Sequence, residues 1–455
     1  MIWNCPNPEI DAIVISDGSR ILGLGDVGLN GLAIPQGKLD LYVAAAGFHP
    51  ARVLPVILDV GTDNAELRSD PFYFGLKRRR VRGDAFFEIM DGVMRALASR
   101  WPDCVVQFED FSSDRASAIL ERYRDHHLCF NDDIQGTAAT ALAGVYSALA
   151  VQGLEANALA RQRFVVAGAG SAGCGVSEML LRAMVEKHGL SPEEARSRFW
   201  MLDKDGLITE QRGAAHGRKG ATRVSPQAAK FARKLSSTGE DRDGESLLEV
   251  VRRVKPTVLI GLAGAGRLFT PEVLRAAGEG VARPVIMAMS NPLSKAECTS
   301  SEAAAATGGR AIYASGSPQP DVTLVDEDRR VLSVASSQAN NVFVFPGVGL
   351  AASLGRTGTV SDGMLLAAAE ALPALIEKAD LARGAVYPRL SEAREVAKRV
   401  AVAVMLQARD EGKLKGAALA ALERGGQEEL LAHVERRMYV PAYHSLIRLP
   451  VGVGE

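Results

Sequence analysis

The sequence of 455 residues predicts an α/β protein whose larger domain is a doubly wound parallel sheet. Two observations support this prediction: short apolar runs alternate with helical segments from about residue 160 onward, and a glycine-rich turn separates the first run from the first helix. Such strands are parallel, joined by right-handed crossovers, and covered by helices on both faces. We expect a smaller α/β domain at 1–134, the parallel-sheet domain at 135–390, and a C-terminal helical segment at 391–455.

Each expected strand of the larger domain is a short apolar run. These runs are 163–167, 199–202, 257–260, 284–289 and 311–314. Helices are expected at 176–187, where apolar residues recur at helical spacing, and at 391–414, which has an amphipathic pattern.

Capping residues predict where two further helices begin. Thr270 precedes Pro271, as at a helix N-terminus, and Ser294 with Glu297 has the spacing of a capping box. The stretch 211–245 is rich in glycine, serine and charge, and is expected to run over the surface.

Composition excludes several classes of function. Lys and Arg total 53 against 54 Asp and Glu, so no net field attracts nucleic acid or an anionic membrane. The basic run at 77–82 is interpreted as a solvated surface or subunit contact, with an anion site as the alternative. The five cysteines are dispersed, as expected of reduced thiols. No apolar run predicts a membrane span and no targeting segment is recognised, so a cytoplasmic protein is expected.

Two segments fit the pattern Gly-x-Gly-x-x-Gly, at 23–28 and 168–173. Only the second follows an expected strand and opens a helix, the context in which backbone N–H groups approach a pyrophosphate. We therefore expect a dinucleotide at Gly168, Gly170, Ser171, Ala172 and Gly173. Asp203 ends the next strand, where an acid would accept the ribose hydroxyls. The first segment is soon followed by Pro35 and more glycines, and is interpreted as tight turns.

Two acid pairs stand among aromatic and apolar residues: Glu109 with Asp110, and Asp132 with Asp133. Taken alone, each pair is better explained by a helix cap or a turn. Buried carboxylates that gather together take up protons unless a cation compensates them. An all-oxygen set without His or Cys favours Mg²⁺ or Mn²⁺ over Zn²⁺.

Two basic residues share the glycine-rich first segment. Arg20 suits bidentate binding of a carboxylate, with a surface charge as an equally good interpretation. Lys38 follows Pro35-Gln-Gly, where a turn would aim it inward, but its context alone favours an ordinary surface lysine.

Together, these segments resemble the malic enzyme family, including the closely related malolactic enzymes. The matching segments of the first half are 16–26, Ile-Pro-Gln-Gly-Lys-Leu at 34–39, Leu-Asp-Val-Gly-Thr at 58–62, Gln-Phe-Glu-Asp-Phe at 107–111 and Phe-Asn-Asp-Asp-Ile-Gln-Gly-Thr at 130–137. Those of the second half are 168–170, Ser-Asn-Pro at 290–292, 295–298, 314–318, Asn-Asn at 340–341 and Phe-Pro-Gly at 345–347. The resemblance runs from about residue 10 to the C-terminus.

The resemblance implies a role for each candidate residue. Glu109, Asp110 and Asp133 would hold Mg²⁺ or Mn²⁺. Arg20 would bind a malate carboxylate, and Lys38 would be the general base, with Asp132 and Arg20 counted among the catalytic residues. Asn291 and Asn341 would contact substrate or nicotinamide.

The implied reaction is oxidative decarboxylation of malate to pyruvate and CO₂ with reduction of NAD. NAD is favoured because Asp203 would repel a 2′-phosphate, while Arg218 and Lys219 keep NADP possible. Lys38 must be neutral to act, so its pKa is expected to fall through desolvation, the cation and Arg20, against the opposing effect of the acids.

The sequence departs from the family pattern in one respect. The family's tyrosine in a Tyr-Thr-Pro segment, which protonates the enol, has no counterpart here. Part of the family's N-terminal domain is also missing, which suggests a misplaced start or a fragment. The alternatives are a malolactic reaction that yields lactate, or a catalytically impaired dinucleotide-binding paralogue. A homo-oligomer, a dimer or tetramer, is expected if the missing part is present.

Overall fold

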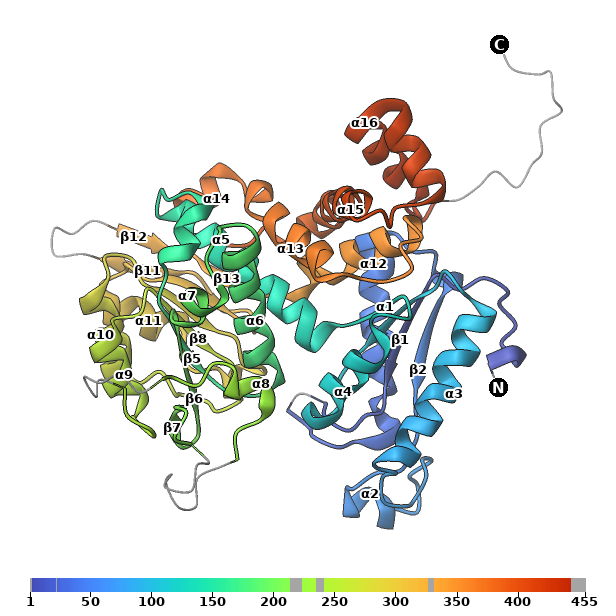
Figure 1. The fold of residues 1–455 in the computed structure, drawn as a ribbon, viewed down its shortest axis with the longest axis horizontal. Helices are drawn as coiled ribbons and strands as arrows, with labels where there is room; N and C mark the ends of the chain where they lie inside the picture. The colour runs from blue at the N-terminus through green and yellow to red at the C-terminus, as the bar shows by residue number, and fades with distance from the viewer. Residues whose placement is uncertain (1, 22, 213–222, 235–240, 326–330, 443–455) are drawn as a thin grey trace.

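The computed structural model describes residues 2–21, 23–212, 223–234, 241–325 and 331–442. Two parallel sheets lie side by side, and the C-terminal helices pack above both of them (Figure 1). The expected α/β class, with a doubly wound larger sheet, is confirmed.

The smaller sheet has the strand order β2-β1-β3-β4, and all its strands are parallel. The strands are β1 (Ala12–Ser16), β2 (Val53–Ile57), β3 (Val105–Phe108) and β4 (Cys129–Asn131). The helices are α1 (Ala33–Ala46), α2 (Ala65–Ser69), α3 (Asp84–Arg100) and α4 (Ser113–Tyr123). Successive strand residues point to opposite faces. Val14 therefore packs with Tyr42 of α1, whereas Ile13 packs with Met90 of α3.

The larger sheet has seven strands in the order β13-β10-β9-β8-β5-β6-β7, of which only β7 is antiparallel to its neighbour. Its strands are β5 (Phe164–Ala167), β6 (Phe199–Asp203), β7 (Gly206–Leu207), β8 (Val258–Gly261), β9 (Val285–Ala288), β10 (Ile312–Ser315) and β13 (Ser336–Gln338). Each of the five predicted apolar runs forms one of these strands. Because helices cover both faces, the strands β5, β6, β8, β9 and β10 are mainly apolar, whereas the edge strand β13 is Ser-Ser-Gln.

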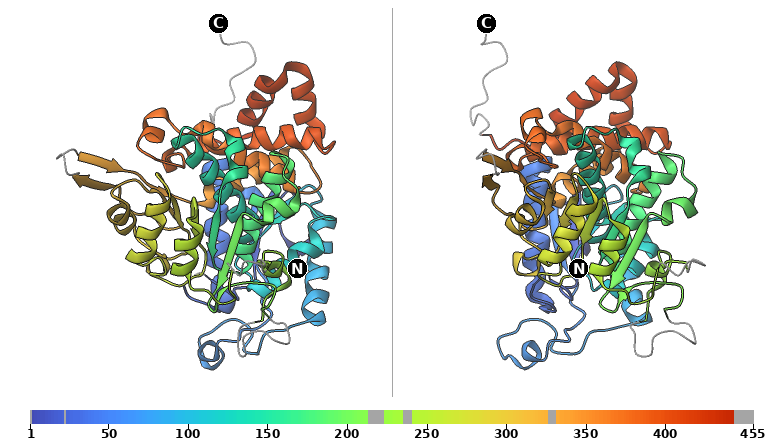
Figure 2. Two further views of the ribbon diagram at one scale, coloured as in Figure 1. Left: turned by 60° about the vertical axis from the view of Figure 1, so that its left-hand side comes forward. Right: turned by 90° about the vertical axis from the view of Figure 1, so that its left-hand side faces the viewer.

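Helices cover both faces of this sheet. They are α5 (Thr137–Val151), α6 (Ser171–Glu186), α7 (Pro192–Arg196), α8 (Pro226–Ala229), α9 (Leu247–Val254), α10 (Pro271–Gly280) and α11 (Ser300–Thr307). Apolar residues of α5 and α6 pack with Val166 and Ile260, while those of α9 and α10 pack with Val165 and Leu259. A hairpin of β11 (Val322–Val325) and β12 (Val331–Val334) projects from the body (Figure 2).

The C-terminal helices join the core that lies between the two sheets. They are α12 (Phe345–Leu354), α13 (Asp362–Ala371), α14 (Lys378–Ala382), α15 (Ala393–Asp410) and α16 (Gly416–Arg437). The helix expected at 391–414 is confirmed as α15. Short 3₁₀ turns lie at Ile2–Asn4, Gly28–Leu32, Pro50–Arg52, Ala156–Arg161, Leu293–Lys295, Asn341–Phe343, Pro373–Leu375 and Leu390–Glu392, and a π-helical turn at Asp132–Gly136.

One local prediction is wrong and another is partly testable. The capping box that begins α11 is Thr299 with Glu302; Ser294 lies in a 3₁₀ turn, and Glu297 is buried beneath Ser290. Both pairs of residues have the spacing of a capping box. Because Glu297 is buried, Thr299 and Glu302 form the capping box instead. Within 211–245, residues 213–222 and 235–240 lie outside the described residues, while Phe231 packs into the core.

One helical segment of the described chain, Asp132–Val151, is long and apolar enough to cross a membrane by length and composition. No such run was expected from the sequence, and for this segment that expectation is wrong. Its most apolar window is 78% buried, so packing in the core accounts for its apolar character.

Candidate active site

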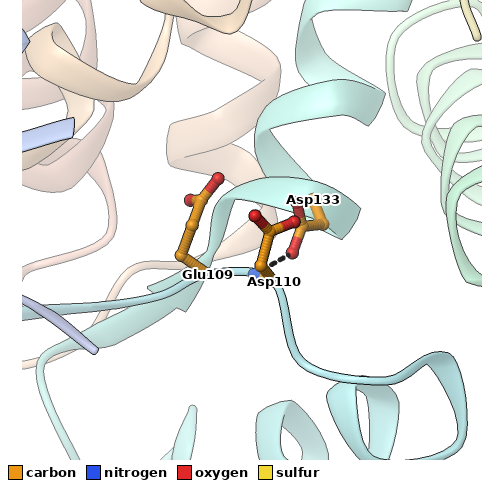
Figure 3. Close-up of side chains that lie close together, drawn as sticks. All are labelled: Glu109, Asp110 and Asp133. Atoms are coloured by element: carbon orange, nitrogen blue, oxygen red, sulfur yellow. Dashed lines mark hydrogen bonds between the residues drawn. The ribbon is translucent and has the colours of Figure 1, made fainter. Parts of the chain in front are cut away.

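Three carboxylates gather where β3 and β4 of the smaller sheet end. Glu109 and Asp110 follow β3 directly, and Asp133 lies in the π-helical turn that follows β4. Because neighbouring parallel strands end at the same edge, their side chains meet there. One oxygen from each residue lies within 4.8 Å of the others, and Figure 3 shows the three side chains turned toward one region. The structure therefore brings together the three residues expected to bind a metal.

Backbone geometry fixes the positions of these acids. Asp110 has a φ of 53°, which turns its N–H toward Asp133, whose Oδ2 accepts it at 2.8 Å (Figure 3). The Asn131 side chain caps the π-helical turn by accepting from the Ile134 N–H at 2.9 Å. π-Helical turns are rare and are often found at functional sites.

Burial dominates the electrostatics of the cluster. It raises the pKa of Glu109 to about 8, and of Asp110 and Asp133 to about 7 each, with repulsion among the acids adding to the effect and Lys38 opposing it. A buried set of carboxylate oxygens with raised pKa values lacks sufficient positive charge. The residues therefore fit a hard divalent cation such as Mg²⁺ or Mn²⁺.

Lys38 projects from α1 into the same cluster. Its Nζ lies 2.5 Å from Asp132 Oδ2, 3.0 Å from Glu109 Oε1 and 4.8 Å from the ring centre of Phe345. Its side chain is only 21% exposed, so the interpretation as a surface lysine is wrong. The expected turn is wrong too, because Pro35 lies in the first turn of α1, where its missing N–H costs no hydrogen bond.

The acids govern the pKa of Lys38. Burial alone would lower it, but Asp132 and Glu109 raise it well above the ordinary value. Two carboxylates at ion-pair distance therefore outweigh desolvation, and the fall expected with a bound cation stays a prediction.

Arg20 lies at the rim of the cluster. Its backbone N–H donates to the Asp110 carbonyl at 3.3 Å. The positive charge of Arg20 lowers the pKa of Asp110 and so opposes the larger effect of burial, which raises it. The Arg20 side chain is exposed. Gly23, Gly25 and Gly28 have positive φ values and lead into a 3₁₀ turn, which confirms that this first glycine motif forms tight turns.

A buried ionic network holds the Arg20 segment. Arg80 forms two hydrogen bonds to Asp26, at 2.6 and 2.7 Å, and one to the Asp17 carbonyl at 2.9 Å. Arg115 of α4 binds the Asp17 carboxylate at 2.9 Å. Arg80 belongs to the basic run at 77–82, and with a side chain only 2% exposed it does not fit the expected solvated surface.

The second glycine motif has the geometry expected for a dinucleotide loop. It follows β5, and α6 begins at Ser171 with Gly170 as its N-cap, so Ala172 and Gly173 lie in the first turn. A Cβ on Gly173 would lie 1.9 Å from the Gly168 carbonyl oxygen, and only glycine permits this approach. Gly170 and Ser171 border a cleft of about 560 Å³ that α4 and α6 line.

Asp203 ends β6, as predicted, but its carboxylate is paired. Arg212 donates to both of its oxygens, at 2.8 and 2.9 Å, and also to Asp243 at 3.0 Å. The Arg212 side chain is 1% exposed. Arg212 therefore balances the charge of Asp203, and repulsion of a 2′-phosphate by this carboxylate stays a prediction. Arg218 and Lys219 lie outside the described residues.

The two candidate asparagines differ in their surroundings. Asn341 Nδ2 donates to Asp132 Oδ2 at 3.2 Å and to Thr137 Oγ1 at 3.0 Å, so it joins the Lys38 cluster. Asn291 follows β9, and its Oδ1 accepts from Ser317 Oγ at 2.7 Å. In the described chain, no hydrogen bond links Asn291 to the acids.

The sequence analysis missed two buried polar residues beside the acids. Tyr42 Oη donates to Gln107 Oε1 at 2.6 Å, and Gln107 Nε2 donates to Glu109 Oε2 at 2.8 Å. Their positions carried a signal: Gln107 stands two residues before Glu109 on a strand, and Tyr42 stands four residues after Lys38 on a helix.

Comparisons with known proteins agree with this architecture. The family model for the malic enzyme N-terminal domain matches residues 1–124, and that for the malic enzyme NAD binding domain matches 134–409. A mitochondrial NAD-dependent malic enzyme of Solanum tuberosum is 45% identical over 456 residues, covering 98% of this chain and 71% of its own. An NADP-dependent malic enzyme of Dictyostelium discoideum is 42% identical over 446 residues, covering 97% and 76%.

Solved structures show the same fold. The malic enzyme of Entamoeba histolytica superposes with a TM-score of 0.68 at 23% identity, over 96% of this chain and 75% of its own. That of Pyrococcus horikoshii gives 0.66 at 24% identity, over 95% and 82%. Both halves of the sequence match, at high identity and nearly full length, and the chain therefore belongs to the malic enzyme family.

Proposed function

We propose that this protein catalyses the oxidative decarboxylation of malate to pyruvate and CO₂ with reduction of NAD. The single observation that carries the proposal is the gathering of Glu109, Asp110, Asp133 and Lys38 around one region. The match to the NAD binding domain and the NAD-dependent relatives support the choice of reaction and cofactor.

Three carboxylates are proposed to hold the cation: Glu109, Asp110 and Asp133. When bound, Mg²⁺ or Mn²⁺ would supply a Lewis acid that polarises the ketone and stabilises the charge left by loss of CO₂. Arg20, exposed at the rim, would pair with a substrate carboxylate. The Asn291 and Asn341 amides would orient substrate and nicotinamide.

Lys38 is proposed as the general base. Its Nζ would accept the proton of the malate hydroxyl while a hydride passes to the nicotinamide from the carbon that bears this hydroxyl. It must first lose a proton of its own, and Asp132, at 2.5 Å, is the nearest acceptor. Asn341 holds the same Asp132 oxygen from the other side and would keep it aligned.

The cofactor loop is proposed to be formed by Gly168, Gly170, Ser171, Ala172 and Gly173, with Asp203 accepting ribose hydroxyls. Because the relatives include an NADP-dependent enzyme, the preference for NAD needs a direct test. Values of kcat/KM for both cofactors would provide it, and a clear preference for NADP would contradict the proposal.

The reaction itself is tested with the purified chain, Mn²⁺, malate and NAD. We expect NADH and pyruvate in equal amounts. Lactate without net NADH would indicate a malolactic reaction, and binding of NADH and Mn²⁺ without either product would indicate an impaired paralogue. Asp133→Ala should abolish turnover and weaken Mn²⁺ binding at least about 100-fold, beyond the loss typical of outer-shell partners, while NADH binding remains.

Assembly and location belong to the same proposal. A homo-oligomer is proposed, and sedimentation would measure its mass. A cytoplasmic location stays a prediction, and fractionation of cells would test it; the plant relatives are named mitochondrial.

A further inference from the structure

Four side chains from one helix and one strand form a linked row next to the acids. Tyr42 Oη donates to Gln107 Oε1 at 2.6 Å, and Gln107 Nε2 donates to Glu109 Oε2 at 2.8 Å. The other oxygen of Glu109, Oε1, lies 3.0 Å from Lys38 Nζ. Tyr42 and Gln107 are fully buried, and Glu109 is 4% exposed.

The spacing in sequence explains why these residues meet. Lys38 and Tyr42 are four residues apart on α1 and therefore lie on one face of the helix. Gln107 and Glu109 are two residues apart at the end of β3 and therefore point to one side of the sheet. Since α1 packs on that side, each pair lies opposite the other.

Hydrogen-bond chemistry gives the row a direction. The hydroxyl of Tyr42 donates to the amide oxygen of Gln107, so the amide nitrogen is left to face Glu109. An amide N–H binds a carboxylate oxygen, whereas an amide oxygen in the same place would repel it. Tyr42 therefore fixes which end of Gln107 faces the acid, and Gln107 engages only Oε2.

We propose that Gln107, held by Tyr42, is a positioning residue that fixes the orientation of the Glu109 carboxylate toward the cation. The inference rests on the proposed metal role of Glu109. Without Gln107, the ion pair with Lys38 would remain but Oε2 would lose its hydrogen bond, so the carboxylate would be held less firmly toward Asp110 and Asp133. Outer-shell partners of this kind contribute about 10- to 100-fold to metal affinity.

The test measures the affinity of the purified 455-residue chain for Mn²⁺ alone by isothermal titration calorimetry. The affinity for NADH is measured on the same samples by fluorescence titration. Gln107→Met keeps length and burial but removes the donor, and should weaken Mn²⁺ binding about 10- to 100-fold. Tyr42→Phe should weaken it roughly 2- to 10-fold, the factor of one hydrogen bond. Gln107→Glu keeps the shape of the side chain and the hydrogen bond from Tyr42 but places a like charge against Glu109. Of the three substitutions, it should weaken Mn²⁺ binding most.

Tyr387→Phe is the matched control. Tyr387 is also a buried tyrosine, and its hydroxyl donates to the Thr140 carbonyl at 2.8 Å; among the described residues no hydrogen bond joins it to Glu109, Asp110 or Asp133. It should leave the Mn²⁺ affinity unchanged, and NADH affinity should be unchanged in every variant. If Gln107→Met does not fold, Tyr42→Phe against Tyr387→Phe carries the test.

The outcomes separate the two proposals. Equal Mn²⁺ affinity in wild type, Gln107→Met and Tyr42→Phe would overturn the positioning role while leaving the metal site intact. A wild-type protein that binds no Mn²⁺ would overturn the metal site itself. Parallel losses of Mn²⁺ and NADH affinity would show a general structural defect and overturn the inference.

Discussion

Lys38 Nζ lies 2.5 Å from Oδ2 of Asp132, a carboxylate whose side chain is completely buried. The lysine comes from the smaller unit, and the aspartate begins the helical segment that enters the larger one. The second oxygen of Asp132, Oδ1, has no hydrogen-bond partner within the described residues. The pair therefore links the two units through a buried acid, one oxygen of which carries the whole contact with Lys38.

Lys38→Arg should separate charge from base function. The substitution keeps a cation beside Asp132 and Glu109, but a guanidinium does not deprotonate in a protein. We expect kcat to fall by about 10²- to 10⁴-fold, the usual contribution of a general base, with little change in NADH binding. Steady-state kinetics with NADH titration would measure both. Turnover within a few-fold of wild type would rule out Lys38 as the base.

Arg80→Met should destabilise the protein and loosen the Arg20 segment. It leaves Asp17 and Asp26 without their shared cation, and breaking a buried ion pair costs about 3–5 kcal/mol. Where the variant folds, KM for malate should rise more than KM for NAD. Arg79→Met, an exposed neighbour in the same basic run, is the control and should change stability by less than about 0.5 kcal/mol. Equal effects of the two substitutions would contradict the network.

Asp203→Ala should shift cofactor preference toward NADP. The substitution removes the acid that would accept the ribose hydroxyls and leaves the guanidinium of Arg212 without one of its carboxylate partners. A hydrogen bond to a charged group is worth more than about 1.4 kcal/mol, so the ratio of kcat/KM for NAD to that for NADP should fall at least about tenfold. An unchanged ratio would mean that Asp203 does not face the ribose.

Glu297→Gln should reveal a buried acid by the pH dependence of stability. Burial raises the pKa of Glu297 above 4.5, although hydrogen bonds from Ser290 and Ala263 oppose the rise. Because the pKa of Glu297 is higher in the folded state than in the unfolded state, the contribution of this group to stability is fully present below pH 4.5. That contribution is lost as the pH rises through the pKa of the folded state. Glutamine is neutral at every pH.

The melting temperature of Glu297→Gln relative to wild type should therefore be higher at pH 8 than at pH 5. Thermal unfolding monitored by circular dichroism at both values would measure the difference. Glu279→Gln, at an exposed position of α10, is the matched control substitution. A difference that is constant across pH would mean that Glu297 ionises normally.

The strands and the acid cluster were predictable because each depends on short-range pattern. Strands buried on both faces read as continuous apolar runs. Glu109, Asp110 and Asp133 were expected to share a metal because the segments 107–111 and 130–137 resemble those of the malic enzyme family. Neither inference requires knowledge of how helices pack.

Positions that depend on packing between distant segments were not predictable. Lys38 points inward because α1 lies across the sheet that carries Glu109, and its local context resembled a surface turn. Arg80 stands among exposed arginines, and only the acids of the 16–26 loop distinguish it from them. The direction in which the pKa of Lys38 shifts was not predictable for the same reason, because it depends on the short distance to Asp132.

The chain passes from β4 through Asp132–Gly136 into α5 without an intervening loop. The boundary expected after residue 134 therefore falls inside a helix rather than in a linker. A chimaera that takes its nucleotide-binding half from another protein would have to keep 129–151 as one piece, because a junction placed there would detach Asp132 and Asp133 from the strand that orients them. Protein engineers who wish to exchange cofactor preference would do better to cut in the segment that follows α5.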